Sequence, residues 1–175
     1  MFKTLKSLFR KPEASPVLQR LVLVRHADAL PATFNGEDET RELSDKGKDQ
    51  ALALGDWLTE ILGEKIGLAL TSTATRTVQT YLAVQSKCAL LPETWTREEE
   101  LYHGGLSDYH SLIENCAATS LIVIGHNPAI GAMAASLIGG DAGLQARILN
   151  MPTAACYVFE RQDHGFGLVD QRTDA

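Results

Sequence analysis

Two short apolar runs constrain the fold of this chain more than any other feature, because each one ends at a histidine. The first run, LVLV at 21–24, is followed by Arg25 and His26. The second, SLIVIG at 120–125, is followed by His126. Continuous apolar runs of this length are typical of parallel strands that are buried on both faces. Ligands of such sheets bind outside the carboxyl ends of the strands, where we expect these three side chains to meet.

A third segment points toward the same place. The apolar stretch IGLAL at 66–70 is followed by Ser72, a predicted helix N-cap, and Arg76 comes one turn into the predicted helix. After His126, Asn127 is a predicted N-cap and Pro128 a predicted first helical residue. A helix that begins there would favour an anion beside the histidine. Two histidines and two arginines at strand ends can surround a phosphoryl group.

Strand and helix patterns alternate along the chain. We predict strands at 20–25, 66–71, 88–96, 120–125, 154–160 and 166–171, and helices at 44–63, 73–86, 107–117 and 128–138. A polar loop at 29–43 should pass over the crevice. The order of elements predicts an α/β fold, a three-layer α/β/α sandwich whose central sheet is mostly parallel and carries an antiparallel hairpin at one edge.

Length and charge separate an extension from a domain. The chain has 175 residues, enough for a single domain at 20–175. Residues 1–19 form a basic amphipathic extension, and residues 1–11 could rest weakly on an anionic membrane surface or on a partner. The alternative is a frayed terminal tail. The formal net charge of −6 argues against nucleic acid as a partner.

The cysteines and carboxylates favour neither disulfides nor a metal site. Cys88, Cys116 and Cys156 are odd in number, widely spaced and without a ligand pattern, so we expect reduced thiols in the cytoplasm. No cluster of aspartates suggests a Mg²⁺ site, and arginine guanidinium groups can compensate phosphate charge without metal. We therefore expect no cofactor and no metal.

Three motifs in order, RHA at 25–27, SxxxRTxxT at 72–80 and GHNP at 125–128, resemble the histidine phosphatase superfamily, also called phosphoglycerate mutase-like. The short length, LSDKGKDQA at 43–51 and MPTAA at 151–155 are most similar to the SixA-type phosphohistidine phosphatases. The resemblance runs from about residue 20 to the C-terminus. It implies the fold predicted above and a phosphatase activity.

The resemblance also implies roles. His26 would be the nucleophile that becomes phosphohistidine, and its second ring nitrogen should donate to a backbone carbonyl. The residues expected to bind phosphate are Arg25, Arg76, His126 and Asn127. His126 would donate a hydrogen bond to phosphate and be cationic. Ala27 departs from the usual motif, which has glycine at this position.

Glu100 is the candidate general acid. It precedes a Gly-Gly-Leu turn at 104–106, as the proton-donating glutamate of the mutase branch precedes such a turn. Short connections would leave the site open to a phosphorylated histidine protein, since mutase-like relatives carry longer insertions that close over small metabolites. Two alternatives are a phosphomonoesterase acting on a small phosphorylated substrate and a phosphate-binding module without turnover.

Overall fold

The computed structural model describes residues 16–32, 37–139 and 141–173. Its strands are β1 (Arg20–Arg25), β2 (Leu68–Ser72), β3 (Thr96–Glu98), β4 (Ser120–Gly125), β5 (Cys156–Gln162) and β6 (Gly165–Arg172). Its helices are α1 (Asp45–Ile61), α2 (Thr75–Lys87), α3 (Glu100–His103), α4 (Leu106–Glu114), α5 (Ala129–Ser136) and α6 (Ala142–Leu149), with a 3-10 helix at Asp38–Thr40. The amphipathic segment predicted at 1–11 lies outside the described residues.

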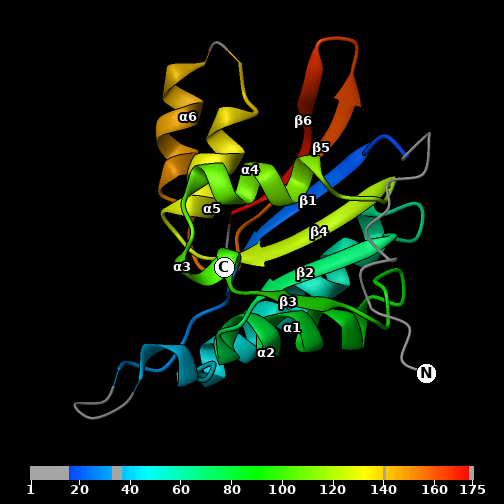
Figure 1. The fold of residues 1–175 in the computed structure, drawn as a ribbon. Coiled ribbons are helices and arrows are strands. Elements are labelled where there is room, and N and C mark those ends of the chain that lie inside the picture. Colours follow the sequence, from blue (N-terminus) through cyan, green and yellow to red (C-terminus); the bar gives the residue numbers. More distant parts are fainter. Residues whose placement is uncertain (1–15, 33–36, 140, 174–175) are drawn as a thin grey trace, which may run out of the picture.

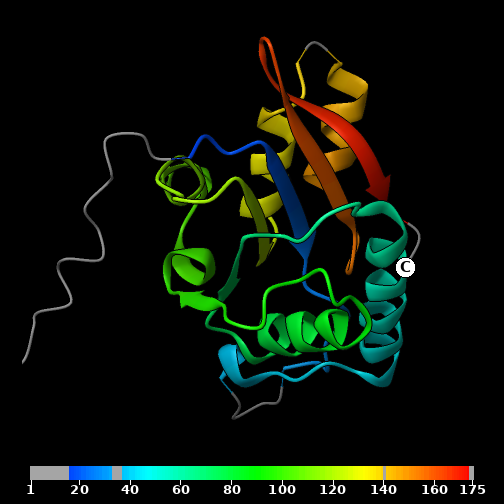
Figure 2. The ribbon, with the colours of Figure 1, turned by 90° about the vertical axis from the view of Figure 1, so that its right-hand side faces the viewer.

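The described strands form one mostly parallel sheet in the order β3-β2-β4-β1-β5-β6 (Figure 1). β1, β2, β3 and β4 pair in parallel, and β5 runs antiparallel to β1. β5 and β6 form the predicted antiparallel hairpin at one edge, drawn orange to red in Figure 2. The predicted fold class is confirmed.

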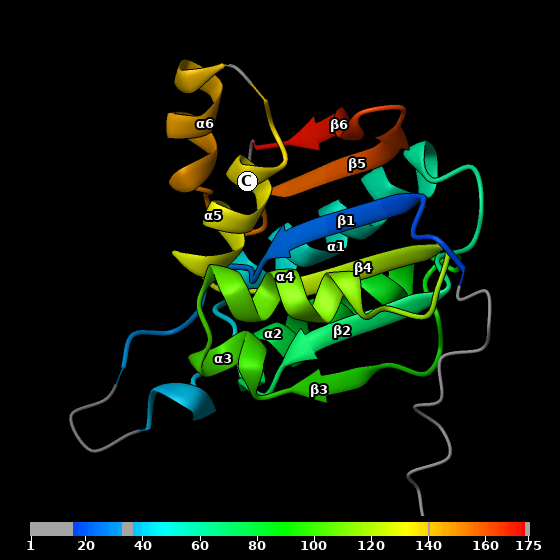
Figure 3. The ribbon, with the colours of Figure 1, turned by 45° about the horizontal axis from the view of Figure 1, so that its top comes forward.

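Both faces of the sheet are covered, which explains the unbroken apolar run of β1. Leu21 and Leu23 pack into a core shared with α4, α5 and α6, while Val22 and Val24 pack into a core shared with α1 and α2. Figure 3 shows α4 and α5 in front of the sheet and α1 and α2 behind it. Alternate side chains of a strand point to opposite faces, so a strand between two helical layers needs apolar residues at every position.

Several predicted boundaries differ from the structure. β3 (Thr96–Glu98) shares only Thr96 with the strand predicted at 88–96, and α5 is shorter than the helix predicted at 128–138. α4 begins at Leu106 after Gly105, rather than at a Ser107 cap, because the Asp108 carboxylate accepts the Gly105 amide at 2.8 Å. The sequence analysis did not predict α6, in which Ile148 is the one buried residue.

The described helices include none that is both long and apolar enough to cross a membrane. Cys88 and Cys156 are buried free thiols, and Cys116 is a half-buried free thiol. The cysteines therefore act as small apolar side chains of the core and its margin.

Candidate active site

Two histidines lie side by side because β1 and β4 are parallel neighbours that end in register. Arg25 pairs with Gly125, and the His26 amide donates to the Gly125 carbonyl at 3.1 Å. The next residue of each strand is a histidine, and the His26 and His126 ring centroids are 5.0 Å apart. The shared register thus brings together residues that are far apart in the sequence.

His26 has the protonation state that a nucleophile requires. Its Nδ1 lies 2.7 Å from the Ala27 carbonyl oxygen. A carbonyl can only accept, so Nδ1 carries the proton and Nε2 keeps its lone pair. Burial lowers the pKa of His26 from 6.5 to about 4, and the nearby Arg76 and Arg25 guanidinium groups add to this effect. The ring is therefore neutral at neutral pH.

Ala27 is accommodated where the related motif has glycine. Its side chain is fully buried, and its amide donates to Thr80 Oγ1 at 3.0 Å. Thr80 lies on α2, so this bond ties the residue after His26 to the helix that carries Arg76.

Two arginines reach the pocket from different elements. Arg76 is 5% exposed, and its Nη1 and Nη2 donate to the carbonyl oxygen and carboxylate of Asp38 at 2.6 and 2.8 Å. Arg25, at the end of β1, donates to the Met151 carbonyl oxygen at 2.6 Å. The buried Nε atoms of both arginines lack a hydrogen-bond partner among the described residues. The described part of the protein therefore does not satisfy either guanidinium group.

The contacts and burial of His126 favour a neutral ring, whereas the sequence analysis expects the cationic form for a hydrogen bond to phosphate. Arg76 Nη2 lies 3.3 Å from Nδ1, and Ser72 Oγ lies 2.6 Å from Nε2. Guanidinium can only donate, so Nδ1 accepts and the Nε2 proton is donated to Ser72. Burial lowers the pKa of His126 to about 3, helped by repulsion from His26 and Arg76. A bound dianion would raise that pKa.

Ser72 and Asn127 are not the helix caps that the sequence predicts. The N-cap of α2 is Ala74, whose amide donates to Ser72 Oγ at 3.1 Å. The N-cap of α5 is Pro128. Asn127 lines the pocket, and its Nδ2 donates to the Met151 carbonyl oxygen at 3.1 Å. Each polar side chain is drawn away from capping by a tertiary partner.

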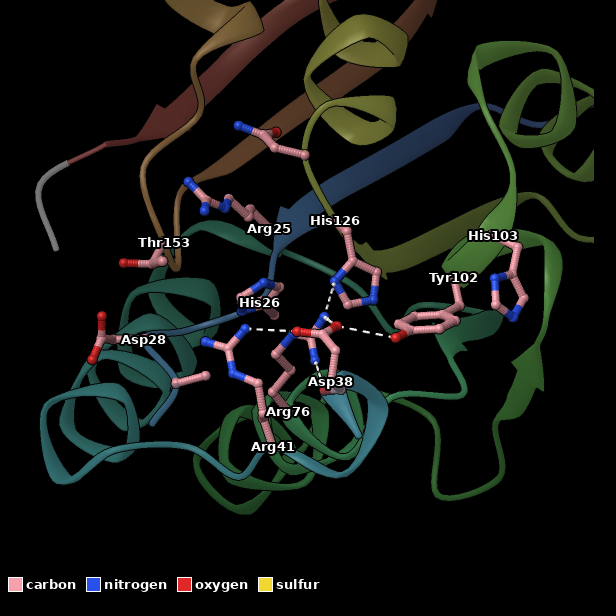
Figure 4. Close-up of a pocket in the computed structure, with 12 residues that line it drawn as sticks. Arg25, His26, Asp28, Asp38, Arg41, Arg76, Tyr102, His103, His126 and Thr153 are labelled. Carbon is pink, nitrogen blue, oxygen red and sulfur yellow. Dashed lines mark hydrogen bonds and ion pairs between the residues drawn. The ribbon is translucent and has the colours of Figure 1, made fainter. Parts of the chain in front are cut away.

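A carboxylate that the sequence analysis missed lies in the pocket wall. Asp38, in the predicted loop, accepts hydrogen bonds from Arg41 at 2.8 Å, Arg76 at 2.8 Å and the Tyr102 hydroxyl at 3.0 Å (Figure 4). The Arg41 hydrogen bond, together with those from Tyr102 and Arg76, holds the pKa of Asp38 well below its usual range. The sequence signal for this residue was an aspartate followed three residues later by an arginine. Both lie in the loop that is expected to pass over the crevice.

Glu100 does not join these residues. It is the first residue of the single-turn helix α3, its side chain is exposed, and it is absent from the pocket lining. Tyr102 and His103 face the pocket instead, and the Tyr102 ring meets the His126 ring edge-on at a centroid distance of 5.5 Å. Residues two apart on a helix point in nearly opposite directions, so the Tyr102 contact turns Glu100 outward.

The pocket has a volume of about 610 Å³. Its described lining carries more cationic than anionic side chains: Arg25, Arg41 and Arg76 against Asp28 and Asp38. Among the described residues, no group of three His, Cys, Asp or Glu side chains could hold a metal ion. The pocket combines a neutral imidazole with several guanidinium groups, a set suited to an oxyanion.

One family model matches the chain, that of the histidine phosphatase superfamily (branch 1), over residues 21–111. No curated protein matches it.

Solved structures of SixA proteins are similar to the chain. One from Agrobacterium tumefaciens, assigned as a phosphohistidine phosphatase, has a TM-score of 0.80 and 27% identity over 90% of this chain and 99% of that chain. One from Nakamurella multipartitia has a TM-score of 0.70 and 26% identity over 88% of this chain and 95% of that chain. The structure of the protein histidine phosphatase SixA complexed with tungstate has a TM-score of 0.70 and 24% identity. The match covers 88% of this chain and 96% of that chain, and it shows a similarity of fold.

Proposed function

The chain belongs to the histidine phosphatase superfamily (branch 1), and we propose that this phosphatase removes the phosphoryl group from phosphohistidine on a protein without using a metal. The observation that carries the proposal is the 2.7 Å contact between His26 Nδ1 and the Ala27 carbonyl oxygen. This contact leaves the lone pair of Nε2 free at neutral pH. A ring held in this way can attack phosphorus without a separate base.

The reaction has two displacements. In the first, the His26 Nε2 lone pair forms a bond to phosphorus, and the bond between phosphorus and the leaving nitrogen breaks with its electron pair going to that nitrogen. In the second, water attacks the phosphorus of the covalent intermediate. The electron pair of the P–N bond then returns to Nε2, and the proton lost by the water goes to solvent or to the phosphate released.

The arginines are proposed to stabilise the transferred group. Arg25 and Arg76 border the pocket that contains His26, and planar guanidinium groups match the oxygens of a phosphoryl group. Their Nε atoms have no hydrogen-bond partner among the described residues, which supports a role as ligands for an anion. We assign His126 and Asn127 to the same site, with His126 taking up a proton when the dianion binds.

The substrate proposal is supported by the chemistry of the leaving group. The imidazole of phosphohistidine leaves more easily than an alkoxide, so the reaction does not depend on a strong general acid. Glu100, the acid suggested by the sequence, is exposed outside the pocket. The similar SixA protein of Agrobacterium tumefaciens is assigned as a phosphohistidine phosphatase, and its whole length is nearly covered by this chain. We place the activity in the cytoplasm, where free thiols such as Cys88 stay reduced.

The test is a parallel assay in EDTA of a phosphorylated histidine protein and a panel of phosphate esters. We expect turnover of the phosphohistidine protein and poor turnover of the esters. Rapid quench with labelled substrate should trap a label that is acid-labile and alkali-stable. His26→Ala should abolish both the label and the turnover.

Glu100→Gln is the matched control, because it removes a carboxylate near the pocket but outside its lining. We expect it to keep full activity on the phosphohistidine protein. Efficient ester turnover by the unmodified protein would favour a small-molecule phosphomonoesterase. Loss of activity in EDTA that a divalent ion restores would refute the metal-free reaction, and a label that remains in His26→Ala would refute the nucleophile.

A further inference from the structure

The pocket that is proposed to receive a phosphoryl dianion has a carboxylate, Asp38, in its wall. The side chain of Asp38 is 49% exposed and borders the same cavity as His26 and His126. A carboxylate beside a dianion repels it, and this repulsion weakens the binding of any substrate whose only charge is on the phosphate. Asp38 is therefore unfavourable for plain phosphate esters.

The position of this carboxylate is fixed by donors from several elements. Arg41 binds Oδ1, while Arg76 of α2 and Tyr102 of α3 bind Oδ2. The carbonyl oxygen of Asp38 is held by Arg76 at 2.6 Å. The neighbouring Glu39 accepts a hydrogen bond from Thr73, which ties the 3-10 helix to the loop before α2. Asp38 is thus held against the pocket by a network rather than free at the surface.

The network leaves acceptor capacity on Asp38. An ionised carboxylate offers about four lone-pair positions. The hydrogen bond from Arg41 uses one lone-pair position on Oδ1, and those from Arg76 and Tyr102 use two positions on Oδ2. The described residues leave one position on Oδ1 unused, and this position is available to a donor from a ligand in the cavity.

We propose that Asp38 is a specificity-determining residue that accepts a hydrogen bond from the protonated imidazole ring of phosphohistidine. The inference rests on the proposed function and adds how the site would prefer that substrate. A phosphohistidine with a protonated ring carries positive charge next to the scissile bond, whereas a phosphate ester carries none. The same carboxylate therefore attracts the leaving group of one substrate class and repels the dianion of the other.

In the step concerned, the proton is on the ring nitrogen that does not carry phosphorus. His26 Nε2 forms its bond to phosphorus as the P–N bond of the substrate breaks. The electron pair of that bond neutralises the leaving ring, which departs as neutral histidine with its proton still hydrogen-bonded to Asp38. Asp38 remains a carboxylate throughout, so atoms, protons and charge balance.

The experiment compares two small substrates that make no protein-docking contacts, N-phosphoimidazole and p-nitrophenyl phosphate. Asp38→Asn removes the charge and keeps the size of the side chain. We expect kcat/KM for N-phosphoimidazole to fall about tenfold or more, the usual worth of a charged hydrogen bond. For p-nitrophenyl phosphate we expect kcat/KM to stay unchanged or rise. Glu42→Gln, an exposed charge removed four residues away, should leave the ratio unchanged.

Two outcomes separate this inference from the proposed function. An equal change on both substrates in Asp38→Asn would show that Asp38 only holds the arginines in place, and would overturn the inference alone. Failure of the unmodified protein to hydrolyse N-phosphoimidazole and the phosphohistidine protein would overturn both. Asp38→Glu keeps the negative charge and should retain more of the preference than Asp38→Asn, a difference that a loss of folding would not produce.

Discussion

Mild acid should destabilise this protein through the two histidines of the pocket, His26 and His126. The folded-state pKa values of His26 and His126 are about 4 and about 3, against an ordinary value of 6.5. Between pH 6.5 and these values, the unfolded chain binds a proton at each ring and the folded chain does not. The free energy of unfolding therefore decreases as pH falls through this window.

The size of the effect follows from the same values. At pH 5 both rings are still neutral in the folded protein, while almost all of the unfolded rings are charged. Each ring then costs about 2 kcal/mol of stability relative to pH 7.5, or about 4 kcal/mol together. A typical domain has about 5–15 kcal/mol in total, so the loss is a large part of the whole.

The assay is urea unfolding at pH 7.5 and pH 5.0 in buffers without phosphate or sulfate, because a bound anion would stabilise the folded state. His126→Gln should lose about half of the pH dependence. Asp38 does not interfere, since a carboxyl group whose folded pKa is lowered loses its stabilising effect only as pH falls below about 4. Equal unfolding free energies at the two pH values would refute the argument that burial keeps these rings neutral.

Two further predictions concern packing around the site. A Cβ at Gly47 would lie 1.9 Å from the Asp28 carbonyl oxygen, so Gly47→Ala should destabilise the protein by about 1–3 kcal/mol, measured by urea unfolding. Gly63→Ala is the control, because a Cβ there would meet no described atom within 4 Å, and it should not destabilise the protein. Tyr109→Phe removes a buried hydroxyl that accepts the His126 amide at 3.2 Å and donates to a carbonyl of α3 at 2.8 Å, and it should cost about 1–3 kcal/mol. A stability equal to that of the unmodified protein in either variant would contradict the packing described.

Local patterns were sufficient for the central strands and for part of the pocket. The unbroken apolar runs before His26 and His126 determined two strands buried on both faces, and the parallel pairing of these strands placed their ends together. The Ser44 N-cap of α1 also followed from sequence, and its hydroxyl accepts the Gly47 amide at 3.0 Å. These features depend on neighbours in the chain and on alternation along a strand, both of which the sequence displays directly.

The tertiary structure decided which polar groups meet. Glu100 looked suitable by spacing, but the direction of α3 turns Tyr102 toward His126 and leaves Glu100 in solvent. Asp38 begins a single-turn 3-10 helix inside a polar segment, where no periodicity indicates direction, and its contacts with Arg76 and Tyr102 from other elements place it in the pocket. The pKa values of the histidines likewise depend on burial and on charges distant in sequence. The sequence by itself thus determined the strands and the residues at their ends, whereas long-range packing decided their protonation and their neighbours.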